Sequence, residues 1–220
     1  MRFSILLCSI ITYIMCGYST LSTAQTSSPE RLFQGLFSGG LNIAQIDGDG
    51  PAGYGYFGVF GSMGVMVQFR PKLSASIELA YSMRGSRQKR DPFDSPLTEF
   101  RARMDYIEIP LLVHIRDKDV LLASVGLVPA VLARNELRYQ AYDPTTGQPA
   151  ATEPPSCLAA EPSRFDLSAA AGVQFFLNSR ATVGARYAYS IIGIREPCVG
   201  ETRARSQFHN LITVRFLYIL

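Results

Sequence analysis

The chain has 220 residues and a formal net charge of +3, a near balance that says little about its partners. Its length suggests one domain. Its hydrophobic content of 47% is high for a secreted chain, yet no apolar run after residue 24 has the roughly 20 residues of a membrane-spanning helix. If the mature protein sits in a membrane, only a closed β-barrel remains, because lipid cannot satisfy the open edges of a sheet.

The N-terminus has the features of a secretory signal peptide. A basic residue is followed by an apolar stretch of about a dozen residues and then by small residues that suit cleavage after position 24. We therefore expect residues 1–24 to be a cleavable signal peptide and residues 25–220 to form the mature domain. Cys16 raises the alternative of a lipoprotein, which Met15 at the preceding position disfavours.

Alternation of apolar and polar residues recurs along the mature chain and predicts β-strands. In "MDYIEIPLLVHIR" (104–116) the odd positions from Ile107 to Ile115 are all aliphatic, whereas the even positions include a glutamate, a proline and a histidine. We predict eight strands, with approximate limits 33–46, 53–69, 73–86, 101–116, 119–136, 163–178, 180–195 and 205–220.

The predicted connections alternate in length, as they do in outer-membrane barrels with short periplasmic turns and long external loops. The turns are very short at 71–72, 117–118 and 179, and the loops are longer at 47–52, 87–100, 137–162 and 196–204. The strands also exceed the roughly 9–11 residues needed to cross a membrane. We therefore predict an all-β, eight-stranded, antiparallel up-and-down transmembrane β-barrel in the bacterial outer membrane, with both termini in the periplasm. The aliphatic faces then meet lipid.

Several segments resemble the PorT-like family of small outer-membrane β-barrel proteins. They are "GLNIAQIDGDG" (40–50), "IELAYSMRGS" (77–86), "MDYIEIPLLVHI" (104–115) and the closing "FHNLITVRFLYIL" (208–220). The resemblance covers essentially the whole mature chain and implies an eight-stranded barrel. Its namesake takes part in a protein secretion system of Gram-negative bacteria, so the resemblance implies a structural or export-accessory role. The proline-rich loop 137–162 departs from the family pattern.

Four charged residues are expected inside the barrel at a similar depth. They are Glu78, Glu108, Arg186 and Arg215, which fall on the polar faces of their strands. Eight strands enclose just enough room for side chains, and a buried charge must be paired. We therefore predict a lumen charge network that plugs the barrel. A gate or a proton path is the alternative.

No catalytic, metal or cofactor site is predicted. The two histidines, His114 and His209, are expected near opposite ends of the barrel, too far apart to share a metal. A lipid-modifying barrel enzyme would need a serine near His209, but Ser206 is three residues away on a strand and is expected on the opposite face. The "DGDG" stretch at 47–50 lacks the later ligands of a calcium loop and predicts a tight hairpin.

The long loops carry two further predictions. Cys157 and Cys198 are the only cysteines left after signal cleavage, and both fall in long loops at the external end. Because the cell surface is oxidising, we predict a disulfide between them, with two independent thiols as the alternative. Four basic residues of the segment 84–103, at the end of the third strand and in the loop after it, could contact lipid phosphates or simply be solvated: Arg84, Arg87, Lys89 and Arg90.

These features together predict a non-enzymatic, monomeric outer-membrane barrel that contacts outer-membrane lipids and secretion or envelope proteins through its external loops. No nucleic-acid motif is present. Two alternatives stay open: a lipid-modifying barrel enzyme, and a soluble lipocalin-like carrier whose aliphatic faces point inward.

Overall fold

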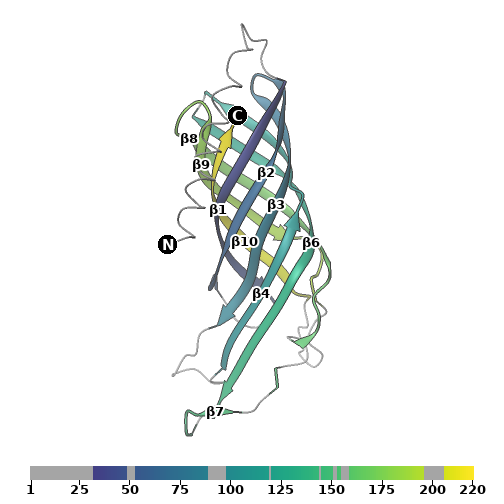
Figure 1. The fold of residues 1–220 in the computed structure, drawn as a ribbon, viewed down its shortest axis with the longest axis vertical. Coiled ribbons are helices and arrows are strands. Elements are labelled where there is room, and N and C mark those ends of the chain that lie inside the picture. Colours follow the sequence, from purple (N-terminus) through teal and green to yellow (C-terminus); the bar gives the residue numbers. More distant parts are fainter. Residues whose placement is uncertain are drawn as a thin grey trace, which may run out of the picture. The chain divides into compact units, whose positions relative to one another are not determined.

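The alternating segments form long antiparallel strands (Figure 1). A computed structural model describes residues 32–48, 53–88, 98–118, 120–143, 145–150, 153–154, 159–195 and 206–220. The strands are β1 (Phe33–Asp47), β2 (Tyr56–Arg70), β3 (Leu73–Gln88), β4 (Thr98–Glu108), β5 (Leu111–Asp117), β6 (Leu121–Tyr142), β7 (Pro149–Ala150), β8 (Phe165–Phe176), β9 (Ala181–Ser190) and β10 (Phe208–Ile219). The predicted signal peptide and Cys16 lie outside the described residues.

The strands close into a ring because the first and last of the major strands pair with each other. β1 pairs with β10 on one side and with β2 on the other, and every other neighbour along the ring is also antiparallel. β4 and β5 together act as one strand, since β3 and β6 pair with both. Pro110, which has no amide hydrogen for the ladder, lies at the break between them. The predicted all-β, eight-stranded antiparallel barrel is confirmed.

The aliphatic face of the strands is the outside of the barrel. The odd residues of the stretch from Ile107 to Ile115 are all exposed, between 42% and 57% of each residue, whereas Leu112 and His114 between them are buried. The alternation continues across the break at Pro110, which is itself buried. A lipocalin-like carrier requires the opposite orientation and does not fit this structure.

Three strands extend further than the sequence predicted, and two loops are correspondingly shorter. β3 runs to Gln88, β4 begins at Thr98, and β6 continues to Tyr142 instead of ending near residue 136. Continuous pairing explains the difference: β4 and β6 stay in register up to Thr98 opposite Ala141, and β7 pairs with the end of β6. The loop predicted at 137–162 therefore begins as a sheet extension, which Figure 1 shows as the far ends of β4 and β6.

The extension begins at a β-bulge. On β4 the register against β6 shifts between Asp105, opposite Arg134, and Tyr106, opposite Leu132. One extra residue of β6 is accommodated there, and such a bulge bends the strand and changes which face later residues occupy.

Among the described residues, no helix is long and apolar enough to cross a membrane.

Candidate functional site

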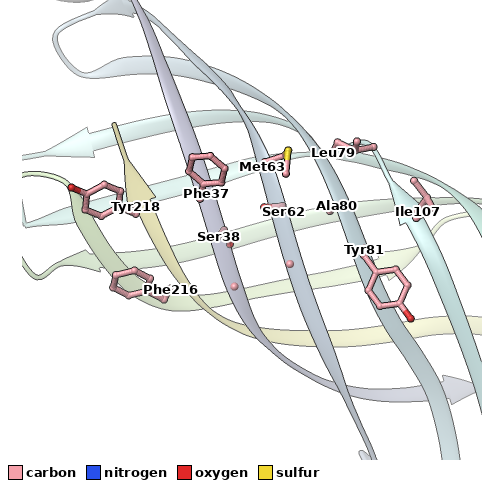
Figure 2. A pocket seen from close by; sticks show the side chains of 12 residues that line it. Phe37, Ser38, Ser62, Met63, Leu79, Ala80, Tyr81, Ile107, Phe216 and Tyr218 are labelled. Atoms are coloured by element: carbon pink, nitrogen blue, oxygen red, sulfur yellow. The ribbon is translucent and has the colours of Figure 1, made fainter. Parts of the chain in front are cut away.

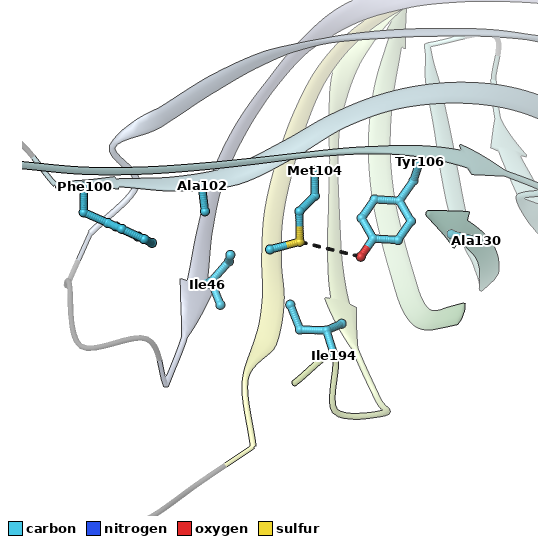
Figure 3. Close-up of a cluster of buried hydrophobic side chains, with 7 residues drawn as sticks. All are labelled: Ile46, Phe100, Ala102, Met104, Tyr106, Ala130 and Ile194. Carbon is cyan, nitrogen blue, oxygen red and sulfur yellow. Dashed lines mark hydrogen bonds between the residues drawn. The ribbon is translucent and has the colours of Figure 1, made fainter. Parts of the chain in front are cut away.

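The interior of the barrel is layered. At the end with the short turns lies an apolar cluster of Leu36, Met66, Leu122, Leu217 and Ile219. At the opposite end lies a second cluster of Ile46, Phe100, Ala102, Met104, Tyr106, Ala130 and Ile194, shown in Figure 3. Charged side chains from several strands meet between these layers, each no more than 2% exposed. A buried charge is tolerated only when it is paired, so the partners of these groups define the site.

Arg84 of β3 is the centre of the first ion-pair group. Its Nε and one terminal nitrogen donate to Glu108 Oε1 at 3.0 and 2.6 Å, and the other terminal nitrogen donates to Asp166 Oδ2 at 2.6 Å. The guanidinium also lies 4.9 Å from the centre of the Tyr106 ring. All of these side chains are essentially inaccessible to solvent. One arginine therefore ties together β3, β4 and β8 across the lumen.

Arg215 and Arg186 continue the network toward the short-turn end. Arg215 donates to both carboxylate oxygens of Glu78 at 3.2 Å, and the Ser62 hydroxyl donates to Glu78 at 2.7 Å. Arg186 lies 3.7 Å from Glu108 Oε2. Both guanidinium groups face the Phe60 ring, at 4.8 Å for Arg186 and 5.6 Å for Arg215. Three arginines thus face three carboxylates, so the network is formally neutral.

The structure places the four lumen residues predicted from the sequence in this one network, and it adds two that the sequence analysis missed. Asp166 was not among the predicted lumen charges. Arg84 was expected among external contacts to lipid phosphate, and this is wrong: its side chain is 1% exposed and paired inside the barrel. Arg84 and Glu78 are an even number of positions apart on β3 and therefore share a strand face. This spacing is the sequence feature that could have placed Arg84 inside the barrel.

The two histidines lie on the inner wall, in different layers. His114 is buried with Nε2 2.8 Å from the Ser76 hydroxyl. His209 is buried with Nε2 3.1 Å from the Tyr106 hydroxyl, and its ring packs edge-on against the Tyr106 ring. The partner of the His209 imidazole is therefore a tyrosine and not Ser206. Among the described residues, no group of three or more potential ligands could hold a metal ion.

The remaining predicted residues divide between the outer surface and the undescribed parts. Arg87 is exposed at the end of β3, opposite Arg101 of β4. Lys89, Arg90 and the two cysteines, Cys157 and Cys198, lie outside the described residues, so the disulfide stays a prediction.

A closed eight-stranded ring with an apolar outside and a paired polar interior defines a small outer-membrane β-barrel protein. The chain belongs to the outer membrane protein beta-barrel domain family, whose model matches residues 15–216. This family assignment places the protein in the outer membrane. No curated protein matches the chain.

Several solved outer-membrane barrels are similar in structure at low sequence identity. The attachment invasion locus protein Ail of Yersinia pestis has 12% identity and a TM-score of 0.45, over 85% of this chain and 98% of Ail. Neisserial surface protein A has 10% identity and a TM-score of 0.43, over 84% and 96%. OprG of Pseudomonas aeruginosa has 11% identity and a TM-score of 0.37, over 85% and 95%.

Proposed function

We propose that this protein is a non-enzymatic, monomeric barrel with a plugged lumen, which acts through its outer wall and its external loops. Its termini lie in the periplasm, and its role is structural or accessory to protein export, as the PorT-like resemblance implies. Its partners are outer-membrane lipids and envelope or secretion proteins.

The observation that carries this proposal is the filled interior. The neutral network around Arg84 lies between two apolar layers, and eight strands leave little space beyond their own side chains. An open channel would need hydrated, accessible charges along the lumen, whereas these groups are almost fully buried. Transport through the barrel would require the network to separate, at the cost of unpaired buried charges.

We expect the purified protein to form no stable channel in planar lipid bilayers, because the ion-pair network blocks the lumen. The measurement is single-channel conductance at low and high salt, with a large porin as a positive control in the same bilayers. Folding is checked by the faster gel migration of the unheated barrel. A large, stable conductance from correctly folded protein would overturn the plugged-lumen proposal.

The disulfide between Cys157 and Cys198 tests the proposal that the two long loops meet at the same end of the barrel. In the chain-entropy model a bridge closing a segment of about 40 residues stabilises by roughly 4 kcal/mol, and measured values are often lower. We expect denatured, unreduced protein to show no free thiols on labelling while migrating as a monomer. Two labelled cysteines per chain would refute the bridge.

A further inference from the structure

The extended ends of β3, β4 and β6 carry five arginines on their outer face, which we call the arginine surface. Figure 3 shows Phe100, Ala102, Met104 and Tyr106 of β4 pointing into the barrel. Because side chains alternate across a strand, the residues between them face outward. The arginine surface consists of Arg87, Arg101, Arg103, Arg134 and Arg138.

Three of these arginines form a row across neighbouring strands. Arg101 of β4 is the register partner of Arg87 on β3 and of Arg138 on β6. The three side chains border one hollow of about 320 Å³, together with Glu99. Like charges directly opposite each other destabilise a sheet. Such a row is therefore costly unless an anion compensates it.

The carboxylates of the same face compensate only part of the charge. Glu136 accepts a hydrogen bond from Arg134 at 2.8 Å and forms an ion pair with Arg138 at 2.6 Å. Arg138 and Arg134 hold the pKa of the Glu136 carboxyl below its usual range. Asp105 pairs with Arg103 at 2.8 Å. Within the described part of the chain, neither Arg87 nor Arg101 forms an ion pair with a carboxylate. Five arginines against three carboxylates leave an excess of two positive charges.

A second feature, an apolar hollow, lies on the outer wall, nearer to the short-turn end than the arginine surface. It has a volume of about 560 Å³, and its floor contains Gly39 of β1 and Gly61 of β2, which are register partners. A Cβ added to either glycine would meet no atom within 4 Å. Phe216 lines one side and Tyr81 and Ile107 line the other (Figure 2). We call this hollow the glycine groove.

The groove and the arginine surface are continuous. Gly39 lies between the exposed Phe37 and Leu41, inside the apolar belt. On β4, Ile107 is the last exposed aliphatic residue before the charged outward positions begin. At this boundary the Tyr81 hydroxyl, from the wall of the groove, donates to Asp105 at 2.8 Å. Asp105 in turn is held by Arg103 of the arginine surface, so apolar and cationic regions meet at one edge.

We propose that the glycine groove and the arginine surface form one binding site for an acylated phosphoglycolipid of the outer leaflet. The Arg87–Arg101–Arg138 row binds its phosphate groups, because guanidinium groups form paired, charge-assisted hydrogen bonds with phosphate. The groove takes one acyl chain, since it opens directly onto the hydrocarbon layer. The inference deepens the proposed function, on which it rests for the outward orientation of the extension.

The test uses the full-length barrel in zwitterionic micelles, titrated with purified lipopolysaccharide, with the same material after phosphatase treatment, and with inorganic phosphate. The variant Arg101→Ala/Arg138→Ala is expected to bind lipopolysaccharide about tenfold more weakly or worse, since it removes charge-assisted hydrogen bonds. Arg70→Ala/Arg180→Ala removes the same charge from exposed positions at the short-turn end and is expected to leave binding unchanged. Phosphatase treatment is expected to weaken binding to the wild-type barrel.

Two further variants separate the headgroup from the acyl chain. Gly39→Leu/Gly61→Leu fills the groove without a backbone clash; it is expected to weaken lipopolysaccharide binding and to leave the weak binding of inorganic phosphate unchanged. Glu136→Gln removes a competing carboxylate and is expected to tighten lipopolysaccharide binding, a gain that misfolding cannot produce.

The proposal fails if the control at the short-turn end loses as much affinity as the row variant, or if dephosphorylated material binds equally well. It also fails if the groove variant changes only the oligomeric state, which would assign the groove to a second copy of the chain. Conductance tests the lumen, and these titrations in micelles test the outer wall whichever side of the membrane the extension faces, so the failure of one is distinguishable from the failure of the other.

Discussion

Replacing Arg84 with methionine is expected to lower the free energy of unfolding by about 3–5 kcal/mol. Its guanidinium makes three hydrogen bonds to two carboxylates, Glu108 and Asp166, and all three side chains are at most 1% exposed. The substitution keeps much of the volume but leaves Asp166 without its arginine inside the barrel. Removing one partner of a buried pair is far more costly than replacing the pair by apolar groups. Urea unfolding of the refolded barrel in lipid vesicles, with the denaturant slope compared between variants, measures the change.

Two comparisons identify the cause of that loss. Arg134→Met removes an arginine that is 55% exposed and paired with Glu136, and an exposed pair of this kind contributes only about 0–1 kcal/mol. The double variant Arg84→Met/Asp166→Asn removes one carboxylate charge as well and keeps Glu108 for Arg186, so two arginines face two carboxylates and most of the lost stability is expected to return. If the double variant is no more stable than the single one, unpaired charge is not the cause.

Arg186→Met is expected to cost less than Arg84→Met. The ion pair between Arg186 and Glu108 is long, at 3.7 Å, and Glu108 keeps its hydrogen bonds to Arg84 when Arg186 is removed. The hydrogen-bonded hub is therefore Arg84, whereas Arg186 adds charge balance between the two halves of the network.

Parity along a strand was enough to find most of the lumen network but not its hub. Glu78, Glu108, Arg186 and Arg215 could be placed inward because clear aliphatic faces surround them. Arg84 has the same parity as Glu78, but its position near the predicted end of the strand favoured a loop assignment. The partners of each ion pair could not be predicted from the sequence either, because Arg84 and Asp166 are 82 positions apart and meet only when the ring closes.

The extension of β6 beyond residue 136 was missed because the polarity of the two sheet faces is reversed there. Within the belt the outward side of β4 is aliphatic, from Ile107 onward. In the part of β4 before Ile107, the outward positions such as Arg101 and Arg103 are charged, whereas Ala102 and Met104 pack inside the barrel. On β6 the bulge opposite Asp105 shifts the parity as well. The alternation therefore changes phase at the membrane boundary. The predicted strand 101–116 still included the reversed part of β4, whereas on β6 the reversal and the bulge together ended the predicted strand near residue 136.

Because this reversal locates the hydrocarbon layer, an arginine in the middle of the aliphatic belt is expected to be strongly destabilising. Leu111 is the central residue of the series from Ile107 to Ile115 and is 45% exposed on the outer wall. Leu111→Arg is expected to cost about 2–4 kcal/mol, because a lipid-facing charge near the bilayer midplane is expensive. The measurement is the free energy of unfolding in phospholipid vesicles, together with the folded yield on insertion.

Val120→Arg is the matched control for this substitution. Val120 is 60% exposed but lies in the short turn before β6, where an arginine reaches the interface and is expected to cost about 0–1 kcal/mol. A wall facing water would tolerate both arginines equally, since surface substitutions usually change stability by no more than about 0.5 kcal/mol. A large loss for Leu111→Arg alone therefore reports the depth of the residue in lipid, and equal, small effects would contradict the membrane-facing assignment of the belt.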